Sequence, residues 1–280
     1  CRLPVCVGMG PTLTLAKVAN HAAKKIRGYN GVCVLDNESE RVQVLAQLTA
    51  SDVWGIGRKL SKKLAFMGIE TALDLAKLPV GIARKDFNVE VERIVRELNG
   101  LPCKGWDSAR ADKKQIYSTR SVGERITDLS SLQQALSKHA GIASQKARQQ
   151  RSLCKVMVCF AASSPFDDKP VSFRAVHKFP YPTSDVSPIT KVATTLAYDL
   201  FVDGARYYKI GVGLIDLVDG RYEQQDLFNP APSNDKLMAV LDDLNHKYGR
   251  DTVFLGVQGI EKKWDMRRNM LTPQYTTKWQ

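Results

Sequence analysis

The sequence predicts an α+β protein made of several domains, because three different patterns follow one another along its 280 residues. Short apolar runs first alternate with helical stripes. Short helices broken by Gly and Pro come next, and a β-α-β-β-α-β pattern follows them. We place the parts at 1–48, 49–103, 113–222 and 223–280. Hydrophobic residues make up 44% of the chain, which is enough for real cores.

The first part, residues 1–48, is predicted to run strand, helix, strand, helix. The apolar run Val5-Cys6-Val7 ends at Gly8, and a helical stripe then extends from Leu13 to Arg27. A second strand is expected at 31–35. Residues 37–40 (Asn-Glu-Ser-Glu) resemble a capping box, so the second helix should begin there.

The second part contains the sharpest local motif, Val53-Trp54-Gly55-Ile56-Gly57-Arg58. It lies between a short helix and a longer one over 59–66, which predicts a helix-hairpin-helix. Gly55 and Gly57 permit a tight turn, and the amides that open the second helix can hold a phosphate. Such a contact would involve Gly55, Ile56, Gly57 and Arg58 and would be independent of base sequence. An ordinary glycine-rich turn between helices is the alternative.

Later helices are predicted from their end signals. Thr71 and Asn88 are expected N-caps, and Asn99-Gly100 is an expected helix stop with a left-handed cap. Residues 101–114 have the Pro, Gly, Ser and charge content of a linker. From 115 to 219 the pattern predicts two amphipathic helices over a four-stranded sheet.

The last part, 223–280, contains one clear predicted helix, Asp235 to Lys247. Its expected apolar stripe is Leu237, Val240, Leu241 and Leu244. A short strand is expected at 253–255, and 260–280 receives no assignment.

The charge of the chain indicates a polyanionic partner. The formal net charge is +12 and the sequence pI is near 9.4, and nucleic acid is the commonest partner of such a surface. A basic, well-solvated surface is the alternative. No apolar run approaches the roughly 18 residues of a membrane helix, so no membrane is expected as a partner.

The cysteines and histidines predict neither disulfides nor a metal site. None of the six cysteines forms a C-x-x-C pair, and we expect them to be reduced and mostly buried in a cytoplasmic protein. Cys154 and Cys159 are an odd number of residues apart, so on one strand they should face opposite sides. The four histidines stand alone, which indicates no zinc site.

Two further basic groups are candidates for phosphate contacts. Lys17 and Lys24 lie seven residues apart on the first helix and so share a face, which would suit a triphosphate. Arg120, Ser121, Gly123 and Arg125 lie along a predicted strand and its end, where they can follow a nucleic-acid backbone. A solvated face is the alternative for Lys17 and Lys24, whereas Arg120 to Arg125 differ from a solvated helix face because they lie along a predicted strand.

Gln224-Gln225-Asp226-Leu227-Phe228, before a Pro-rich stretch, suits a short peptide that docks in a hydrophobic pocket of a partner. A Leu-Phe pair folded onto its own domain is the alternative. The acid pairs are poor metal ligands, because Asp167-Asp168 lies in a predicted hairpin turn and Asp242-Asp243 on the polar side of a predicted helix.

Together the motifs resemble the Y-family translesion DNA polymerases of the UmuC type, the polymerase subunits of bacterial DNA polymerase V. Gly10 to Ala19 with Ala23-Lys24-Lys25 look like the late palm, and Asp52 to Arg58 with Val95 to Gly100 look like the thumb. Thr119 to Thr127 resembles the opening of the little finger. Met270 to Trp279 is similar to the tail of UmuC-type members. The likeness covers nearly the whole chain.

The resemblance implies error-prone synthesis across damaged template in the SOS response. It implies triphosphate contacts at Lys17 and Lys24, thumb contacts with DNA at Gly55, Gly57 and Arg58, and template contacts at 120–125. It also implies that Gln224, Leu227 and Phe228 bind the sliding clamp. The implied partners are primer-template DNA, a deoxynucleoside triphosphate, the sliding clamp, a UmuD-type dimer and a RecA filament.

The chain departs from this family in one respect. The carboxylates that hold Mg2+ are expected upstream of Cys1, so this piece alone should not polymerise, and no catalytic residue is assigned within it. We expect both ends to be truncated. The competing hypotheses are a non-catalytic DNA-binding or clamp-binding module and a small α+β RNA-binding protein, of which the latter leaves the hairpin motif unexplained.

Overall fold

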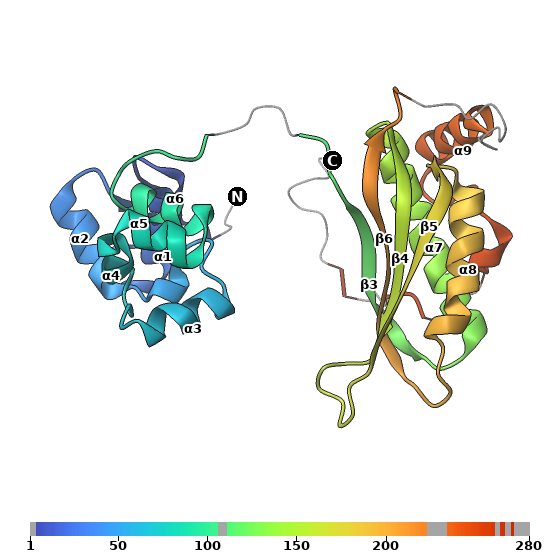
Figure 1. The fold of residues 1–280 in the computed structure, drawn as a ribbon, viewed down its shortest axis with the longest axis horizontal. Coiled ribbons are helices and arrows are strands. Elements are labelled where there is room, and N and C mark those ends of the chain that lie inside the picture. Colours follow the sequence, from blue (N-terminus) through green and yellow to red (C-terminus); the bar gives the residue numbers. More distant parts are fainter. Residues whose placement is uncertain (1–3, 106–110, 223–233, 261–263, 267–269, 272–280) are drawn as a thin grey trace. The chain divides into compact units, whose positions relative to one another are not determined.

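A computed structural model describes residues 4–105, 111–222, 234–260, 264–266 and 270–271. The chain forms two compact units, Cys1–Arg110 and Ala111–Gln280, which are taken one at a time below. Both units mix helices and strands, as the sequence predicts (Figure 1). Among the described residues, no helix combines the length and the apolar character needed to cross a bilayer.

Unit 1 begins with the predicted order of strand, helix, strand, helix. The elements are β1 (Val7–Met9), α1 (Leu13–Lys25), β2 (Val32–Val34) and α2 (Glu38–Gln47). β1 and β2 pair in parallel. The first strand lies two residues later than predicted. Thr12 caps α1 and Asn37 caps α2 through side-chain oxygens that accept amide hydrogen bonds.

The rest of unit 1 is helical. Its elements are η1 (Ala50–Asp52), α3 (Arg58–Phe66), α4 (Ala72–Lys77), α5 (Val80–Ile82), η2 (Ala83–Phe87) and α6 (Val89–Leu98). Thr71 and Asn88 cap α4 and α6 as predicted, and Gly100 ends α6 with φ of 83°. One continuous apolar core extends from Leu15 to Leu98, so the predicted parts 1–48 and 49–103 share a core.

Unit 2 has the predicted β-α-β-β-α-β order. The elements are β3 (Ile116–Ile126), α7 (Leu129–Gln149), β4 (Ser152–Ala162), β5 (Ser172–Thr183), α8 (Val186–Leu200) and β6 (Tyr207–Asp219). The antiparallel sheet has the order β3-β6-β4-β5. α7 and α8 pack on one face of this sheet, and the core lies between the two layers (Figure 1). α9 (Asp235–Tyr248) and η3 (Gly256–Gln258) follow.

The expectation that Cys154 and Cys159 face opposite sides is wrong. Both thiols are fully buried in the core between the sheet and the helices. Simple alternation fails because β4 shifts its register with β5 between Cys154 and Val156. Opposite this point, Asp216 of β6 has a positive φ of 53°. Such an irregularity changes which face the following side chains occupy.

The expected apolar stripe of α9 is also wrong in part. Leu237 and Val240 are 52% and 55% exposed, while Met238 is 3% exposed and packs inward. The inward face also carries Asp242, which was expected on the polar side and instead forms an ion pair with Arg148. α9 therefore packs on unit 2 through Met238 and Asp242 and not through the full apolar stripe that periodicity predicts.

No strand forms at 253–255. Instead, the backbone of Val253 pairs with a side chain, because the Asn245 amide donates to its carbonyl at 2.8 Å and accepts from its N–H at 3.0 Å. An amide side chain thereby takes the place of a strand neighbour.

Candidate nucleic-acid interface

The turn between η1 and α3 is built around a single left-handed residue. Gly55 has φ of +99°, and a Cβ at this position would lie 2.8 Å from the Cδ1 atom of Ile94. Val53 and Ile56 are buried, and the Ile56 amide donates to the Val53 carbonyl at 3.0 Å. The turn therefore presents Trp54 and Gly57 outward while its apolar residues fix it to the core.

Gly57 differs from the sequence expectation. It is the N-cap of α3 with φ of −86° and ψ of 174°, an extended conformation that any residue adopts, and open space surrounds the position of its missing Cβ. The tight turn therefore needs Gly55 alone. The missing side chain at Gly57 does leave the first amides of α3 uncovered, which suits the approach of a backbone phosphate.

The cations beside this turn are of two kinds. Arg58, Lys59 and Lys62 are exposed and form no hydrogen bond or ion pair within the described ranges. Lys63 is engaged, because it donates to the Asp86 carbonyl and lies 4.5 Å from the centre of the Phe87 ring. The positive charge available to a ligand thus lies mainly at the start of α3.

Lys17 and Lys24 both lie on α1, and both side chains are exposed. Their spacing of seven residues places them on one face, as predicted. The buried side of the same helix packs into the core through Leu15, Val18 and Ala22. The lysine face is therefore directed away from the core.

The β3 candidates differ in their surroundings. Arg120 is exposed, whereas the guanidinium of Arg125 forms hydrogen bonds at 3.1 and 3.2 Å with Asp167 and lies over the Tyr208 ring. The Gly123 amide donates to the Trp264 carbonyl at 3.0 Å. Two of the predicted contacts, Arg125 and Gly123, therefore already have partners within the protein.

Sequence reasoning missed the sheet face opposite α7 and α8, here called the open sheet face. Its residues alternate with those of the core on all four strands. The members of this face are Tyr117, Thr119, Val158, Phe160, Arg174, Val176, Lys178 and Lys209. Arg174, Lys178 and Lys209 are exposed and make no hydrogen bond or ion pair in the part of the chain that the structure describes.

Two glycines of β6 shape the centre of the open sheet face. A Cβ at Gly213 would lie 2.3 Å from Tyr117 Cε1, and one at Gly211 would lie 2.6 Å from Phe160 Cζ. The two rings therefore lie across the glycines. A hollow of about 260 Å³ lies beside them and is lined in part by Arg174. Alternate glycines in one strand were the sequence signal for this close approach.

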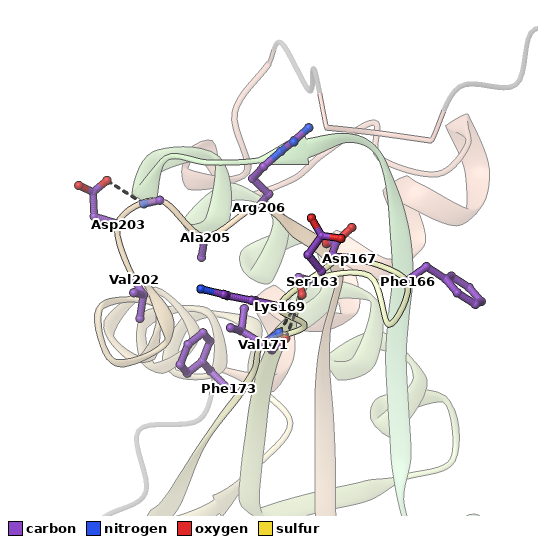
Figure 2. Close-up of a pocket in the computed structure, with 12 residues that line it drawn as sticks. Ser163, Phe166, Asp167, Lys169, Val171, Phe173, Val202, Asp203, Ala205 and Arg206 are labelled. Atoms are coloured by element: carbon purple, nitrogen blue, oxygen red, sulfur yellow. Dashed lines mark hydrogen bonds between the residues drawn. The ribbon is translucent and has the colours of Figure 1, made fainter.

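A second hollow of about 580 Å³ lies at one end of the sheet, between residues 163–173 and 202–206 (Figure 2). Lys169 and Arg206 bring positive charge to it, and Asp167 and Asp203 bring negative charge. Phe166 is 94% exposed and points away from the hollow. The mixed charge gives this hollow no clear preference for an anion.

A buried histidine lies behind β3. His139 is 3% exposed, and its Nδ1 is 2.9 Å from the Ser118 hydroxyl. Burial, reinforced by the positive charges of Lys138 and Arg120, lowers the pKa of His139 to about 4. This histidine is therefore neutral near pH 7 and adds no charge to the interface.

Two of the sequence predictions fall outside this geometry. Gln224, Leu227 and Phe228 lie outside the described residues. Among the described residues, no group of three His, Cys, Asp or Glu side chains is arranged to hold a metal ion.

Comparison with known protein families and solved structures identifies the class of protein to which this fold belongs. Residues 113–227 match the model of the impB/mucB/samB family C-terminal domain, and 235–280 match a domain of unknown function, DUF4113. A solved Y-family DNA polymerase chimera (Dbh-Dpo4(243-245)-Dbh) is similar with a TM-score of 0.50 and 20% identity, covering 75% of this chain and 57% of that one. The fold is that of the Y-family DNA polymerases.

Curated relatives narrow this class. Protein UmuC of Salmonella typhimurium is 41% identical over 99% of this chain and 67% of its own length. Protein MucB of Escherichia coli is 39% identical over 98% of this chain and 66% of its own length. DNA polymerase IV of Pelotomaculum thermopropionicum is 24% identical over 90% of this chain and 60% of its own length. The chain belongs to the UmuC family of Y-family polymerases and spans about two thirds of the length of its relatives.

Proposed function

We propose that this chain is the DNA-gripping part of a translesion DNA polymerase that carries out error-prone synthesis during SOS DNA repair in the cytoplasm. The observation that carries the proposal is the open sheet face, which carries the exposed cations Arg174, Lys178 and Lys209 together with the exposed ring of Tyr117 and the partly buried ring of Phe160. In this assignment residues 1–48 are palm, 49–103 thumb, 113–222 little finger and 223–280 clamp motif and tail.

The grip has two surfaces in this proposal. In unit 1 the helix-hairpin-helix holds a strand backbone through the amides that follow Gly55, with Arg58 adding charge. In unit 2 the open sheet face and Arg120 follow the phosphates of primer-template DNA. Both surfaces contact the phosphate backbone of the DNA and not the base edges. Such contacts suit an enzyme that must accept a distorted template.

Salt dependence of DNA binding tests the grip. Replacing Arg174, Lys178 and Lys209 together by Ala should weaken binding and lower the slope of log K against log salt by about 2–3, because three phosphate contacts release about that many counterions. The matched control replaces the exposed cations Lys191, Lys236 and Arg250, which lie on α8, on α9 and just after α9. Equal losses in the two triple variants would refute the assignment of the open sheet face.

The whole enzyme transfers deoxynucleotides with the help of divalent metal ions, which we assign as Mg2+. Lys17 and Lys24 contact the incoming triphosphate, because two ammonium groups on one exposed face suit its charge. Lys24→Ala in the full-length polymerase should raise the KM for deoxynucleotides, while the exposed Lys77 of α4 serves as a matched control. An unchanged KM would remove Lys24 from the site.

The proposed protein partners are the sliding clamp, a UmuD-type dimer and a RecA filament. Gln224, Leu227 and Phe228 form the clamp motif, so Phe228→Ala should abolish clamp capture and leave DNA affinity unchanged. Clamp binding by this variant at the level of the unaltered chain would exclude the motif. Family likeness along nearly the whole chain favours this reading over a non-catalytic DNA-binding or clamp-binding module.

A further inference from the structure

The region after the little-finger sheet is attached to α7 at several points along that helix. At the C-terminal end of α7, Arg148 forms two hydrogen bonds of 2.6 and 2.7 Å with Asp242 of α9. Arg148 also donates to the Ser184 carbonyl at 2.7 Å. The Val186 amide donates to the Met238 sulfur at 3.4 Å, so α9 is held at the junction of the two sheet-covering helices.

Further along the chain, the contacts move toward the N-terminal half of α7. Gln258 is 4% exposed and lies against Gly141, where a Cβ would be 3.1 Å from its amide nitrogen. Gly259 has φ of +69°, and a Cβ there would lie 2.6 Å from the Gln134 side chain. Glycine is thus favoured at 259 by its left-handed conformation, and the Gln134 side chain lies against it.

Trp264 reaches from α7 to the edge strand β3. Its side chain is 5% exposed and packs in the core of unit 2. The next residue, Asp265, forms an ion pair of 2.7 Å with Lys138 of α7, and the Lys138 ammonium lies 5.5 Å from the centre of the Trp264 ring. The Trp264 carbonyl accepts the hydrogen bond from the Gly123 amide at 3.0 Å.

The hydrogen bond between Gly123 and Trp264 lies in the part of β3 that is not regularly paired with β6. β3 pairs regularly with β6 through Ser121, and its register then shifts before pairing resumes at Ile126. The Gly123 amide lies within that shift, on the outermost strand of the sheet. An unpaired amide in a bulged edge strand leaves the strand free to move, and the Trp264 carbonyl supplies the missing acceptor.

We propose that Trp264 is a positioning residue for DNA, and that the contacts of Asp242, Gln258, Trp264 and Asp265 form a brace which fixes the 120–125 edge of β3 in its binding conformation. The inference rests on the proposed DNA grip. It assigns a role to the region matched by the domain of unknown function. The brace fixes the backbone of β3 on both sides of Gly123, and so the strand that carries Arg120, and it touches no DNA itself.

Amide hydrogen exchange and DNA affinity in the full chain test the brace together. Trp264→Ala should raise the exchange rate at Gly123 and weaken DNA binding by roughly three- to tenfold, which corresponds to about 1 kcal/mol. Far-UV circular dichroism and a cooperative denaturant transition report whether the variant still folds. Ile260→Ala, at a position that is 90% exposed in the same segment, should leave both quantities unchanged.

A second variant keeps the test decisive if Trp264→Ala does not fold. Asp265→Lys places a like charge against Lys138 and adds positive charge, which by itself would tighten DNA binding. Weaker binding together with faster exchange at Gly123 therefore supports the brace. Ile260→Lys, which adds positive charge to the same segment without breaking an ion pair, should bind DNA at least as tightly as the unaltered chain.

The outcomes separate the two proposals. If loss of the brace speeds exchange at Gly123 without weakening DNA binding, while the Arg174, Lys178 and Lys209 variant does weaken it, the grip stands and the brace is overturned. Unchanged exchange at Gly123 in a folded Trp264→Ala variant also overturns the brace. If neither the triple variant nor the brace variants affect DNA binding, both the grip and the brace are overturned.

Discussion

The Glu97 carboxylate at the end of α6 accepts a hydrogen bond of 2.8 Å from the backbone amide of Lys104. The same fully buried carboxylate accepts from the Cys103 amide at 3.2 Å and from the Thr14 amide at 3.1 Å, and the Thr14 hydroxyl also donates to it. One side chain thus joins the first turn of α1, the end of α6 and the start of the predicted linker.

Glu97→Gln should destabilise unit 1 by about 1–3 kcal/mol, because the amide group replaces a charged acceptor with a donor that faces other donors. Denaturant unfolding of the full chain, followed by a probe in unit 1, measures the change. Glu38→Gln, whose carboxylate is 82% exposed in an i,i+3 pair with Arg41, should cost less than about 0.5 kcal/mol. Equal effects in both variants would contradict the role of Glu97.

The same carboxylate gives a pH dependence. Burial alone would raise the pKa of Glu97, but hydrogen bonds from Thr14, Lys104 and Cys103 hold it below its usual 4.5. A lowered folded-state pKa means that this stabilisation is fully present above about pH 4.5 and is lost as the pH falls through the folded-state value. The stability gap between the unaltered chain and Glu97→Gln should therefore narrow in acid, and a gap that widens below pH 4.5 would exclude this assignment.

Gly55 and Gly57 should respond differently to replacement by Ala. Gly55→Ala places a side chain at φ of +99° and against Ile94, so it should cost about 1–2 kcal/mol or more. Gly57→Ala meets open space at an extended backbone and should change the stability by less than about 0.5 kcal/mol. Thermal unfolding of the two variants measures the difference, and equal destabilisation would mean that the turn is strained at both glycines.

Local sequence patterns predicted most helices and strands, whereas the residues that share a sheet face depend on long-range strand register. The caps at Thr71 and Asn88 are encoded within four residues, so the sequence alone located them. The open sheet face instead depends on pairing between Arg174 and Phe160, and between Phe160 and Gly211, which joins three strands. Periodicity in one strand could not show which cations gather there.

Trp264 shows a second limit of sequence reasoning. Its contact with Gly123 joins residues 141 positions apart, and its neighbours in the chain are polar and charged, so no periodic pattern marks it as core. Cys154 and Cys159 show a third limit. Their odd spacing predicts opposite faces only in a regular strand. The register shift after Cys154 brings both side chains to the same face.

His139 should make unit 2 sensitive to mild acid. Its pKa is lowered to about 4 in the folded chain, while the unfolded value is near 6.5. Between these values only the unfolded state binds the proton, so stability is full above about pH 6.5 and falls by up to about 3 kcal/mol as the pH drops to 4. NMR titration of the imidazole measures the pKa directly. His139→Asn should flatten this part of the stability profile, and an unchanged profile would assign the acid sensitivity to other groups.

The buried thiols should be chemically inert compared with the half-buried ones. Burial raises the pKa of Cys154 and that of Cys159 to about 12, so almost no thiolate forms at pH 8. Cys6 and Cys103 are partly exposed. Iodoacetamide at pH 8, followed by peptide mass spectrometry, should label Cys6 and Cys103 on the order of a thousandfold faster than Cys154 and Cys159. Adding denaturant should remove the difference. Rapid labelling of Cys159 in the native chain would mean that the sheet and its helices separate far more often than this core implies.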